Sequence, residues 1–170
     1  MSTVGWTIAT VLAFVTTWVL DVFVANQGAL ATIIGFGGGL YTLVRLGQAV
    51  WRRQQRLVLA RAGAAVVWFA LPVSVLDTNR WLNARAAERA AEVVRAVDAY
   101  EHDQGSYPRS LSALVPRYLP EVPQAKPTVM GDFRYIPPAR GRAPTLLYVE
   151  LPPFGRRAYH FDERVWFTID

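Results

Sequence analysis

The chain of 170 residues contains no cysteine, and acidic residues are almost missing from its first half. Without cysteine, disulfide frameworks, zinc fingers built on thiolates and thiol nucleophiles are excluded. Up to position 77 the only acidic residues are Asp21 and Asp77, and the only basic residues are five arginines. Charge is dense only beyond this point, so the apolar residues are not distributed as they are in a soluble domain.

The formal charge of +5 does not indicate a nucleic-acid-binding protein. Residues 78–170 contain 13 basic and 11 acidic side chains, which leaves this half nearly neutral, and the rest of the excess lies among apolar segments. Cationic residues between apolar segments are typical of membrane proteins, in which they remain in the cytoplasm. We therefore expect a lipid bilayer as a partner, and no nucleic acid.

Three apolar segments are each long enough to cross a bilayer, for which about 20 residues are needed. They cover residues 4–24, 29–50 and 57–76. We interpret the first as an uncleaved span rather than a secretory signal peptide, because no basic region precedes it and the apolar run is too long. Asp21 lies near its end, where we expect water or lipid headgroups to reach it; a proton-relay role is the alternative.

Small residues recur every four positions in the second apolar segment, at Ala31, Gly35 and Gly39. On a helix this spacing places them on one face, and small residues let helix backbones approach closely within a membrane. We predict that this face packs against another helix, either in this chain or in a second copy of it. A phosphate-binding loop is the alternative, but it would need a preceding strand.

Four arginines surround the link between the second and third apolar segments: Arg45, Arg52, Arg53 and Arg56. The first turn, at residues 26–28, has no basic residue. The positive-inside rule therefore predicts a cytoplasmic link and a cytoplasmic amino terminus. Everything after the third segment is then periplasmic, and the expected location is the inner membrane of a bacterium.

The third apolar segment contains Pro72, which predicts a bend in the helix. Beyond position 77 apolar residues recur at steps of three and four, as expected for one face of an amphipathic helix. This face consists of Ala86, Ala90, Val93, Val97 and Tyr100. We predict that one long helix crosses the membrane and continues as the spine of a domain. Gly105 is the expected left-handed stop, and Pro108 blocks continuation.

The last 50 residues change to a period of two, which is typical of β-strands. A short helix is expected at 110–115, and prolines at 120, 123 and 127 predict an irregular loop before the strands. The predicted core-facing residues are Phe133 and Tyr135, then Leu147, Val149 and Leu151, then Tyr159 and Phe161, then Val165, Phe167 and Ile169. The predicted fold is three transmembrane helices (residues 1–77) followed by an α+β domain (residues 78–170), in which the spine helix packs on a small antiparallel sheet.

The segment that ends the spine helix resembles the corresponding region of type II secretion major pseudopilins and type IV pilin-like proteins. The matching residues are Tyr100, Gly105, Tyr107, Pro108, Leu111 and Leu114. The resemblance covers about residues 83–170, and it implies a spine helix followed by a short helix and a small antiparallel sheet. Pro72 corresponds to the bend in the pilin spine.

The amino-terminal half departs from that family, which has a cleavage site with a glutamate five residues into the mature chain. In this sequence Gly35 would place Leu40 at the glutamate position, and Gly63 would place Trp68 there. Two additional spans also precede the spine. The resemblance therefore implies the fold of the domain and not filament formation, and it assigns no functional residue.

Residues 101–103, Glu-His-Asp, are the only tight cluster of potential metal ligands. Consecutive helical residues point about 100° apart, so we interpret this cluster as a solvated helix end. His160 is expected at the surface, and no spacing suggests a catalytic triad. We therefore predict a protein that is not an enzyme and that has neither a metal site nor a cofactor.

Two functions are compatible with the sequence. The first is a non-catalytic inner-membrane protein whose pseudopilin-like periplasmic domain serves assembly or interaction in an envelope or secretion-type complex, with a protein partner or with self-association in the membrane. The alternative is a membrane-anchored sensory or ligand-binding module that signals through the Pro72 helix. In the alternative a pocket would be lined by tyrosines: Tyr107, Tyr118, Tyr135, Tyr148 and Tyr159.

Overall fold

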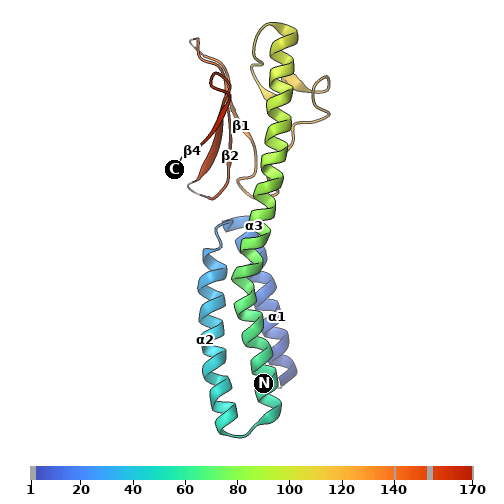
Figure 1. The fold of residues 1–170 in the computed structure, drawn as a ribbon. Helices are drawn as coiled ribbons and strands as arrows, with labels where there is room; N and C mark the ends of the chain where they lie inside the picture. Colours follow the sequence, from blue (N-terminus) through green and yellow to red (C-terminus); the bar gives the residue numbers. More distant parts are fainter. Residues whose placement is uncertain (1–2, 140, 153–154, 170) are drawn as a thin grey trace. The chain divides into compact units, whose positions relative to one another are not determined.

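The computed structural model describes residues 3–139, 141–152 and 155–169. The chain divides into two compact units, which we call the helical unit (residues 1–80) and the sheet unit (residues 81–170). Helix α3 (Gln55–Gln104) belongs to both, because its first part lies in the helical unit and its second part in the sheet unit (Figure 1). The predicted long helix is therefore confirmed.

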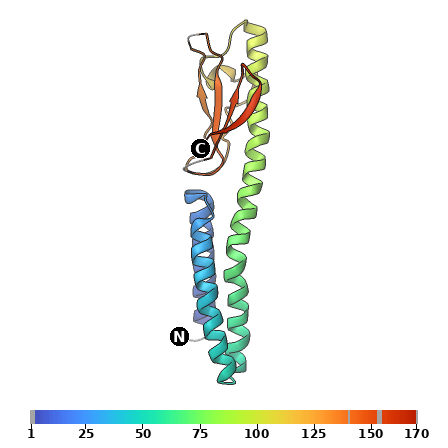
Figure 2. The ribbon, with the colours of Figure 1, turned by 60° about the vertical axis from the view of Figure 1, so that its left-hand side comes forward.

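The described part of the helical unit contains three long helices, which run side by side (Figures 1 and 2). Helix α1 (Thr3–Val19) continues as the π-helix η1 (Leu20–Ala25), a polar turn follows, and α2 (Ala29–Trp51) returns beside it. The first part of α3 completes the unit. All three helices are long and apolar enough to cross a membrane, as the sequence predicts.

The small-residue stripe of α2 lies against α3 of the same chain. Ala31, Gly35 and Gly39 are buried. A Cβ atom added at Gly35 would lie 2.8 Å from Pro72 Cδ, and one at Gly39 would lie 2.7 Å from the ring of Phe69. The absence of side chains at these two glycines therefore lets the backbone of α2 approach α3 closely.

Helix α3 continues through Pro72, although a proline inside a helix frees the carbonyl four residues before it. The freed carbonyl belongs to Trp68, and its oxygen lies 2.8 Å from the position that a Cβ of Gly35 would occupy. The neighbouring helix therefore covers this carbonyl at the point where α3 cannot satisfy it. Such cover is what makes proline tolerable in a membrane helix.

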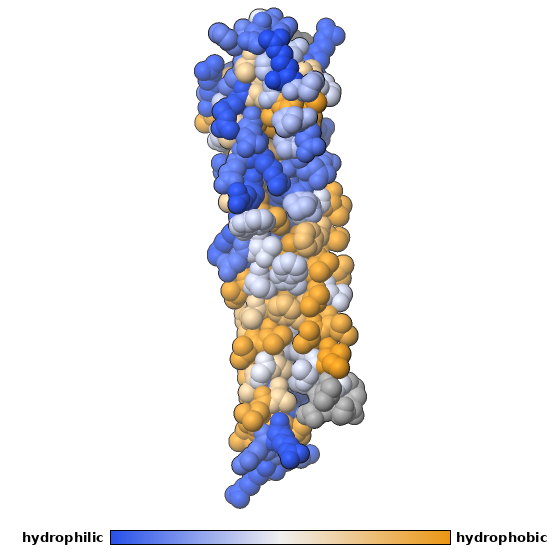
Figure 3. Space-filling view, turned by 90° about the vertical axis from the view of Figure 1, so that its right-hand side faces the viewer, coloured by the Kyte–Doolittle hydropathy of each residue, from blue (hydrophilic) through white to orange (hydrophobic). Residues whose placement is uncertain are grey.

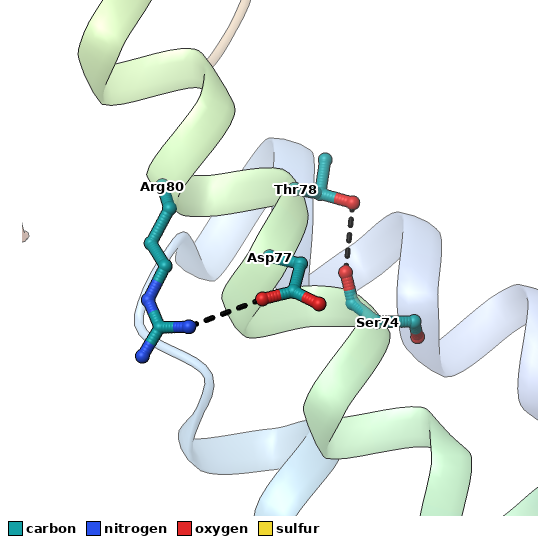
Figure 4. A network of polar contacts seen from close by, with 4 residues as sticks. All are labelled: Ser74, Asp77, Thr78 and Arg80. Carbon is teal, nitrogen blue, oxygen red and sulfur yellow. Dashed lines mark hydrogen bonds and ion pairs between the residues drawn. The ribbon is translucent and has the colours of Figure 1, made fainter.

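The apolar part of α3 ends in a short polar network (Figure 4). The Thr78 hydroxyl donates to the Ser74 carbonyl at 2.8 Å, and Arg80 pairs with Asp77 at 3.1 Å. Both members of the ion pair are exposed, so the pair adds little stability. On the face seen in Figure 3, apolar side chains cover most of the helical unit and hydrophilic ones cover most of the sheet unit.

The sheet unit begins with the second part of α3, which ends at Gln104 and is followed by Gly105 in the left-handed conformation (φ +68°). The short 3₁₀ helix η2 (Leu111–Leu114) follows, within the range predicted for a short helix. Four antiparallel strands then form a sheet of order β1-β2-β3-β4 beside α3 (Figure 2). They are β1 (Arg134–Ile136), β2 (Thr145–Val149), β3 (Arg156–His160) and β4 (Val165–Ile169).

The core of the sheet unit lies between α3 and one face of the sheet. The predicted face of the spine helix is the one that packs there: Ala86, Ala90, Val93 and Val97 are fully buried, and Tyr100 is half-buried against the same core. Val93 and Val97 pack with Leu146, Tyr159 and Phe161, whereas the two alanines make room for Tyr148. Burial of these apolar side chains is the main force that holds the sheet to the helix.

The predicted core-facing residues of two strands are wrong. In β2 the buried side chains are Leu146 and Tyr148, and in β4 Trp166 packs against the core. Because successive side chains alternate between faces, residues predicted for the core lie on the opposite face of these strands or beyond their ends. These residues are Leu147, Val149, Leu151, Val165, Phe167 and Ile169. The error arises because both faces are apolar, so alternation alone does not distinguish them.

Candidate functional site

The face of the sheet that points away from α3, which we call the outer face, is the main candidate for a functional surface. Leu147 of β2 pairs with Ala158 of β3, and Ala158 pairs with Phe167 of β4, so these three side chains form one row across the sheet. A second row contains Ile136, Thr145, His160 and Val165. The first row is apolar apart from Arg134, which pairs with Leu147 at its β1 end, and two of the four residues of the second row, Ile136 and Val165, are apolar.

The outer face is exposed as well as apolar. Val165 is 44% exposed and Ile136 is 47% exposed, while Leu147, Val149 and Phe167 are partly exposed. An antiparallel sheet that packs on one side normally carries polar residues on the other. A contiguous apolar patch on a water-facing surface instead marks an interaction site.

A shallow depression extends the outer face onto the loop before β1. It is lined by Val129, Met130, Ile136, Leu147 and Val149, and Val129 is the most exposed of them at 73%. Charged side chains also border the depression: Asp132, Arg134 and Arg156. An apolar centre with a charged border is the composition of protein interfaces.

Strand β4 adds an edge to this surface, because it is the last strand in the order of the sheet. Its five residues, Val-Trp-Phe-Thr-Ile, include no charged residue, no proline and no glycine. Natural sheets usually protect an edge of this kind with charge, proline or a bulge, because its backbone groups can pair with another strand. Strand β4 is therefore suited to the addition of a strand from a partner.

Lys126 fixes the loop that carries Val129 and Met130. This residue is 1% exposed, and its Nζ atom donates to the Glu150 carbonyl at 2.8 Å, just after β2. Its own backbone N–H donates to the Gly131 carbonyl at 2.9 Å. Burial lowers the pKa of Lys126 to about 8, although the nearby Glu150 carboxylate opposes this shift. Lys126 therefore connects the loop to the sheet at the border of the depression.

Arg89 holds the same loop from the side of α3. Its Nη1 atom donates to the carbonyls of Gln124 and Ala125 at 3.2 and 3.3 Å. The side chain of Gln124 in turn donates to Asp132 at 3.1 Å. Sequence reasoning missed both Lys126 and Arg89, and the only available signal was that Lys126 is the one lysine among 18 basic residues.

The residues of the pilin-like motif lie at the end of the core and not on the outer face. Leu111 and Leu114 are buried in the core, the Tyr107 ring packs on Phe161 with centroids 5.8 Å apart, and Tyr100 packs on Tyr118 at 5.5 Å. The Tyr135 hydroxyl donates to the Pro108 carbonyl at 2.9 Å, and burial raises the pKa of Tyr135 well above its usual value. This motif therefore closes the end of the core, where its side chains mainly pack against one another and against the sheet unit.

The five tyrosines proposed as pocket-lining residues are also used in the core. Tyr148 and Tyr159 are buried, and the rings of both lie against Trp166. Tyr107, Tyr118 and Tyr135 pack around the same core. Because these rings already contact protein, they do not support the ligand-binding alternative.

Residues 101–103 do not converge on a metal site. The Asp103 carboxylate pairs with Arg117 at 3.0 Å and accepts the Tyr118 hydroxyl at 3.0 Å, which fixes the segment after η2 to the end of α3. Among the residues that the structure describes, no three histidine, aspartate or glutamate side chains gather. His160 lies on the outer face, half-exposed, with its ring 4.2 Å from that of Phe167.

In the helical unit, the expectation that water reaches Asp21 is wrong, because this side chain is fully buried. Its Oδ1 atom accepts the N–H of Gly28 at 2.8 Å and that of Gln27 at 3.3 Å, and its Oδ2 atom accepts the N–H of Ala31 at 2.7 Å. The first N–H groups of a helix have no partner within it. Asp21 therefore caps α2 from the preceding helix, which is a structural role.

The four arginines singled out for topology are all exposed: Arg45 lies in α2, Arg52 and Arg53 lie in the turn after it, and Arg56 lies in the first turn of α3. Arg61 of α3 donates to the carbonyl of Arg45. These contacts place the arginine-rich link at one end of the helical unit. The Asp21 cap lies at the other end of α2.

Comparison of the chain with protein-family models, with curated proteins and with solved structures finds no match. The function is therefore inferred from the surfaces of the two units. The outer face and the edge of β4 are the features that point most directly to a partner.

Proposed function

We propose that the protein is a non-catalytic integral membrane protein whose sheet unit binds a protein partner in an envelope complex of the secretion type. The observation that carries this proposal is the apolar outer face of the sheet, which continues onto Val129 and Met130. Aliphatic and aromatic side chains bind by burial, and an interface centre of this composition favours a protein over a small polar ligand.

We propose that the helical unit anchors the sheet unit in the bacterial inner membrane. Three helices long and apolar enough to span a membrane support the anchor. The arginine-rich link supports a cytoplasmic position for the connection between α2 and α3, and hence a periplasmic sheet unit. Reporter fusions at Arg53 and after residue 169 should therefore respond oppositely.

We further propose that the sheet unit is a pilin-like domain. The support is its element order, in which a long helix is followed by the short helix η2 and a four-stranded antiparallel sheet. The motif residues at the end of α3 support the same relationship. Because two apolar helices precede α3, the proposed role is a fixed interaction partner and not a filament subunit that leaves the membrane.

The experiment is photo-crosslinking in native membranes. A photoreactive residue at Ile136 or Phe167 reports on the outer face, and one at Arg95, which is exposed on α3, serves as the control. We expect protein adducts from the two outer-face positions and few or none from position 95. Equal labelling at all three positions, or no protein adduct at Ile136 and Phe167, would contradict the proposed interaction.

A further inference from the structure

The link between α2 and α3 carries basic charge that the chain itself does not neutralise. Arg52, Arg53 and Arg56 are exposed, and none of them pairs with an acidic side chain among the described residues. The only acidic residues of the helical unit are Asp21, which caps the other end of α2, and Asp77, which pairs with Arg80. The charge of the link is therefore free to pair with an anionic group from outside the chain.

A shallow cleft lies beside these arginines, between the end of α2 and the first turn of α3. It is lined by Val50, Arg53, Gln55, Val58 and Leu59. Val50 and Leu59 are exposed and belong to the same apolar helix surfaces that face outward along α2 and α3. The cleft thus combines an apolar wall with a guanidinium group at one end.

Arg53 occupies a position that glycine normally fills. It follows the end of α2 with φ +57°, in the left-handed region that residues with a Cβ adopt only at a conformational cost. Backbone hydrogen bonds hold the turn, from Arg53 N–H to the Val50 carbonyl at 3.0 Å and from Gln54 N–H to the Ala49 carbonyl at 2.9 Å. The guanidinium group is therefore presented from a defined turn, at a position where glycine would be less strained.

We propose that this cleft binds an anionic phospholipid, with the phosphate paired to Arg53 and assisted by Arg52 and Arg56. One acyl chain would lie along Val50, Val58 and Leu59. Guanidinium groups pair with phosphate through two parallel hydrogen bonds, and basic clusters at the ends of membrane helices attract anionic lipids. The apolar wall favours a lipid over free phosphate or an acidic peptide. This inference rests on the proposed membrane placement of the helical unit.

The test is lipid retention by the full chain in nanodiscs that contain phosphatidylcholine and phosphatidylglycerol, read by native mass spectrometry after release into detergent. We expect the wild-type protein to retain phosphatidylglycerol in excess of its bulk fraction. Arg53→Asn should reduce this preference about tenfold, which corresponds to about 1.4 kcal/mol. Asparagine adopts positive φ more readily than most residues, so the turn is kept.

Arg109→Asn removes the same charge from an exposed position in the sheet unit, and it should leave the lipid preference unchanged. Glycerol phosphate, which has the anionic group without acyl chains, should not displace the lipid. Equal retention of the two lipids by the wild-type protein, or the same preference in Arg53→Asn, would overturn the proposal. Displacement by glycerol phosphate would also overturn it, because the apolar wall would then contribute nothing.

Leu59→Gln gives a second measurement if Arg53→Asn does not fold. Leu59 is 78% exposed, so this substitution removes part of the apolar wall without disturbing the interior. It should lower retention of both charged and neutral lipid at this site, and unchanged retention would count against the proposal. Release of the wild-type protein from membranes by alkaline carbonate, without detergent, would instead remove the membrane placement and with it both this inference and the proposed anchor.

Discussion

The helical unit and the sheet unit both expose large apolar side chains, but they do so in different patterns. In the helical unit such side chains occur on all three helices, and examples are Ile8, Leu12, Ile33, Leu40, Leu59 and Val66. In the sheet unit many of them gather on the outer face and its neighbouring loop, as Val129, Met130, Ile136, Val165 and Ile169 do. Apolar exposure on every helix is the pattern of a protein surrounded by lipid, whereas apolar exposure on one face is the pattern of an interaction surface, as proposed for the outer face.

The interiors of the two units differ as well. Helices α2 and α3 meet through Gly35 and Gly39, and a side chain at either position would collide with α3. The sheet unit instead fills the space between α3 and the sheet with Leu146, Tyr148 and Tyr159. The helical unit should therefore be sensitive to enlargement of small residues, and the sheet unit to truncation of large ones.

The largest expected effect tests the two faces of β2. Leu146 is fully buried and Leu147 lies on the outer face, so the same substitution can be made at adjacent positions. Leu146→Ala should lower the free energy of unfolding by about 3 kcal/mol, because it leaves a cavity. Leu147→Ala should cost about 1 kcal/mol or less. Denaturant titration in detergent, followed by tryptophan fluorescence, measures both, and equal costs would contradict the assignment of the faces.

The next effect concerns the cap of α2. Asp21→Ala removes the acceptor of three backbone N–H groups, and a buried donor without a partner is costly, so we expect a loss of about 2 kcal/mol. Asp77→Ala breaks only an exposed ion pair and should change stability by less than about 0.5 kcal/mol. Thermal unfolding in detergent compares the two variants. If Asp21→Ala unfolds at the wild-type temperature, the cap has no energetic role.

A smaller effect is expected from alanine substitutions at two glycines of α2, which should change stability differently. Gly35→Ala should destabilise the protein by about 1–2 kcal/mol, because the added Cβ would lie 2.8 Å from atoms of α3. A Cβ at Gly37 would have no atom within 4 Å, so Gly37→Ala should be neutral or stabilising by up to about 1 kcal/mol through helix propensity. The same thermal assay measures both. Destabilisation by Gly37→Ala would show that Gly37 is in close contact with another part of the protein.

The smallest effect is the pH dependence that Lys126 adds to the sheet unit. Its pKa is about 8 in the folded protein and about 10.5 in the unfolded chain, so the unfolded chain binds more protons between these values. The free energy of unfolding should therefore rise with pH across this window, by about 1 kcal/mol. This is less than the full pKa shift of a completely desolvated charge would produce.

Lys126→Met should remove this rise. The titration should cover pH 7.5 to 9.5, below the range in which the tyrosines ionise. Their pKa values are raised in the folded protein, so above about pH 10 the tyrosines of the unfolded chain lose protons first and stability falls. Denaturant midpoints of the wild type and the variant at several pH values give the two slopes. Identical slopes would show that Lys126 does not titrate differently in the folded protein.

The helices, and a small antiparallel sheet of three or four strands, could be predicted from the sequence because each leaves a pattern of apolar residues. The apolar runs define three helices, and the steps of three and four from Ala86 to Tyr100 identify the face of α3 that is buried. The faces of β2 and β4 could not be predicted in the same way. Both faces of these strands carry large apolar side chains, and the choice depends on which of them fit against the alanines of α3.

The polar contacts that hold the structure were less predictable. Asp21 caps α2 from the π-helix η1, and this geometry depends on an irregular turn with Asn26 and Gly28 in left-handed conformations. A lone lysine such as Lys126 is normally expected at the surface. Its burial depends on contacts between a proline-rich loop and the end of β2, which no local pattern encodes.

The close approach of Gly35 to the free carbonyl of Trp68 has a consequence for biogenesis in a bilayer. Proline leaves α3 with one backbone oxygen that neither lipid nor its own helix can satisfy. Since α2 is translated first, the glycine that shelters this oxygen has already emerged from the ribosome when Pro72 follows. The glycine face of α2 is thus available to cover the Trp68 carbonyl as soon as α3 is inserted beside it.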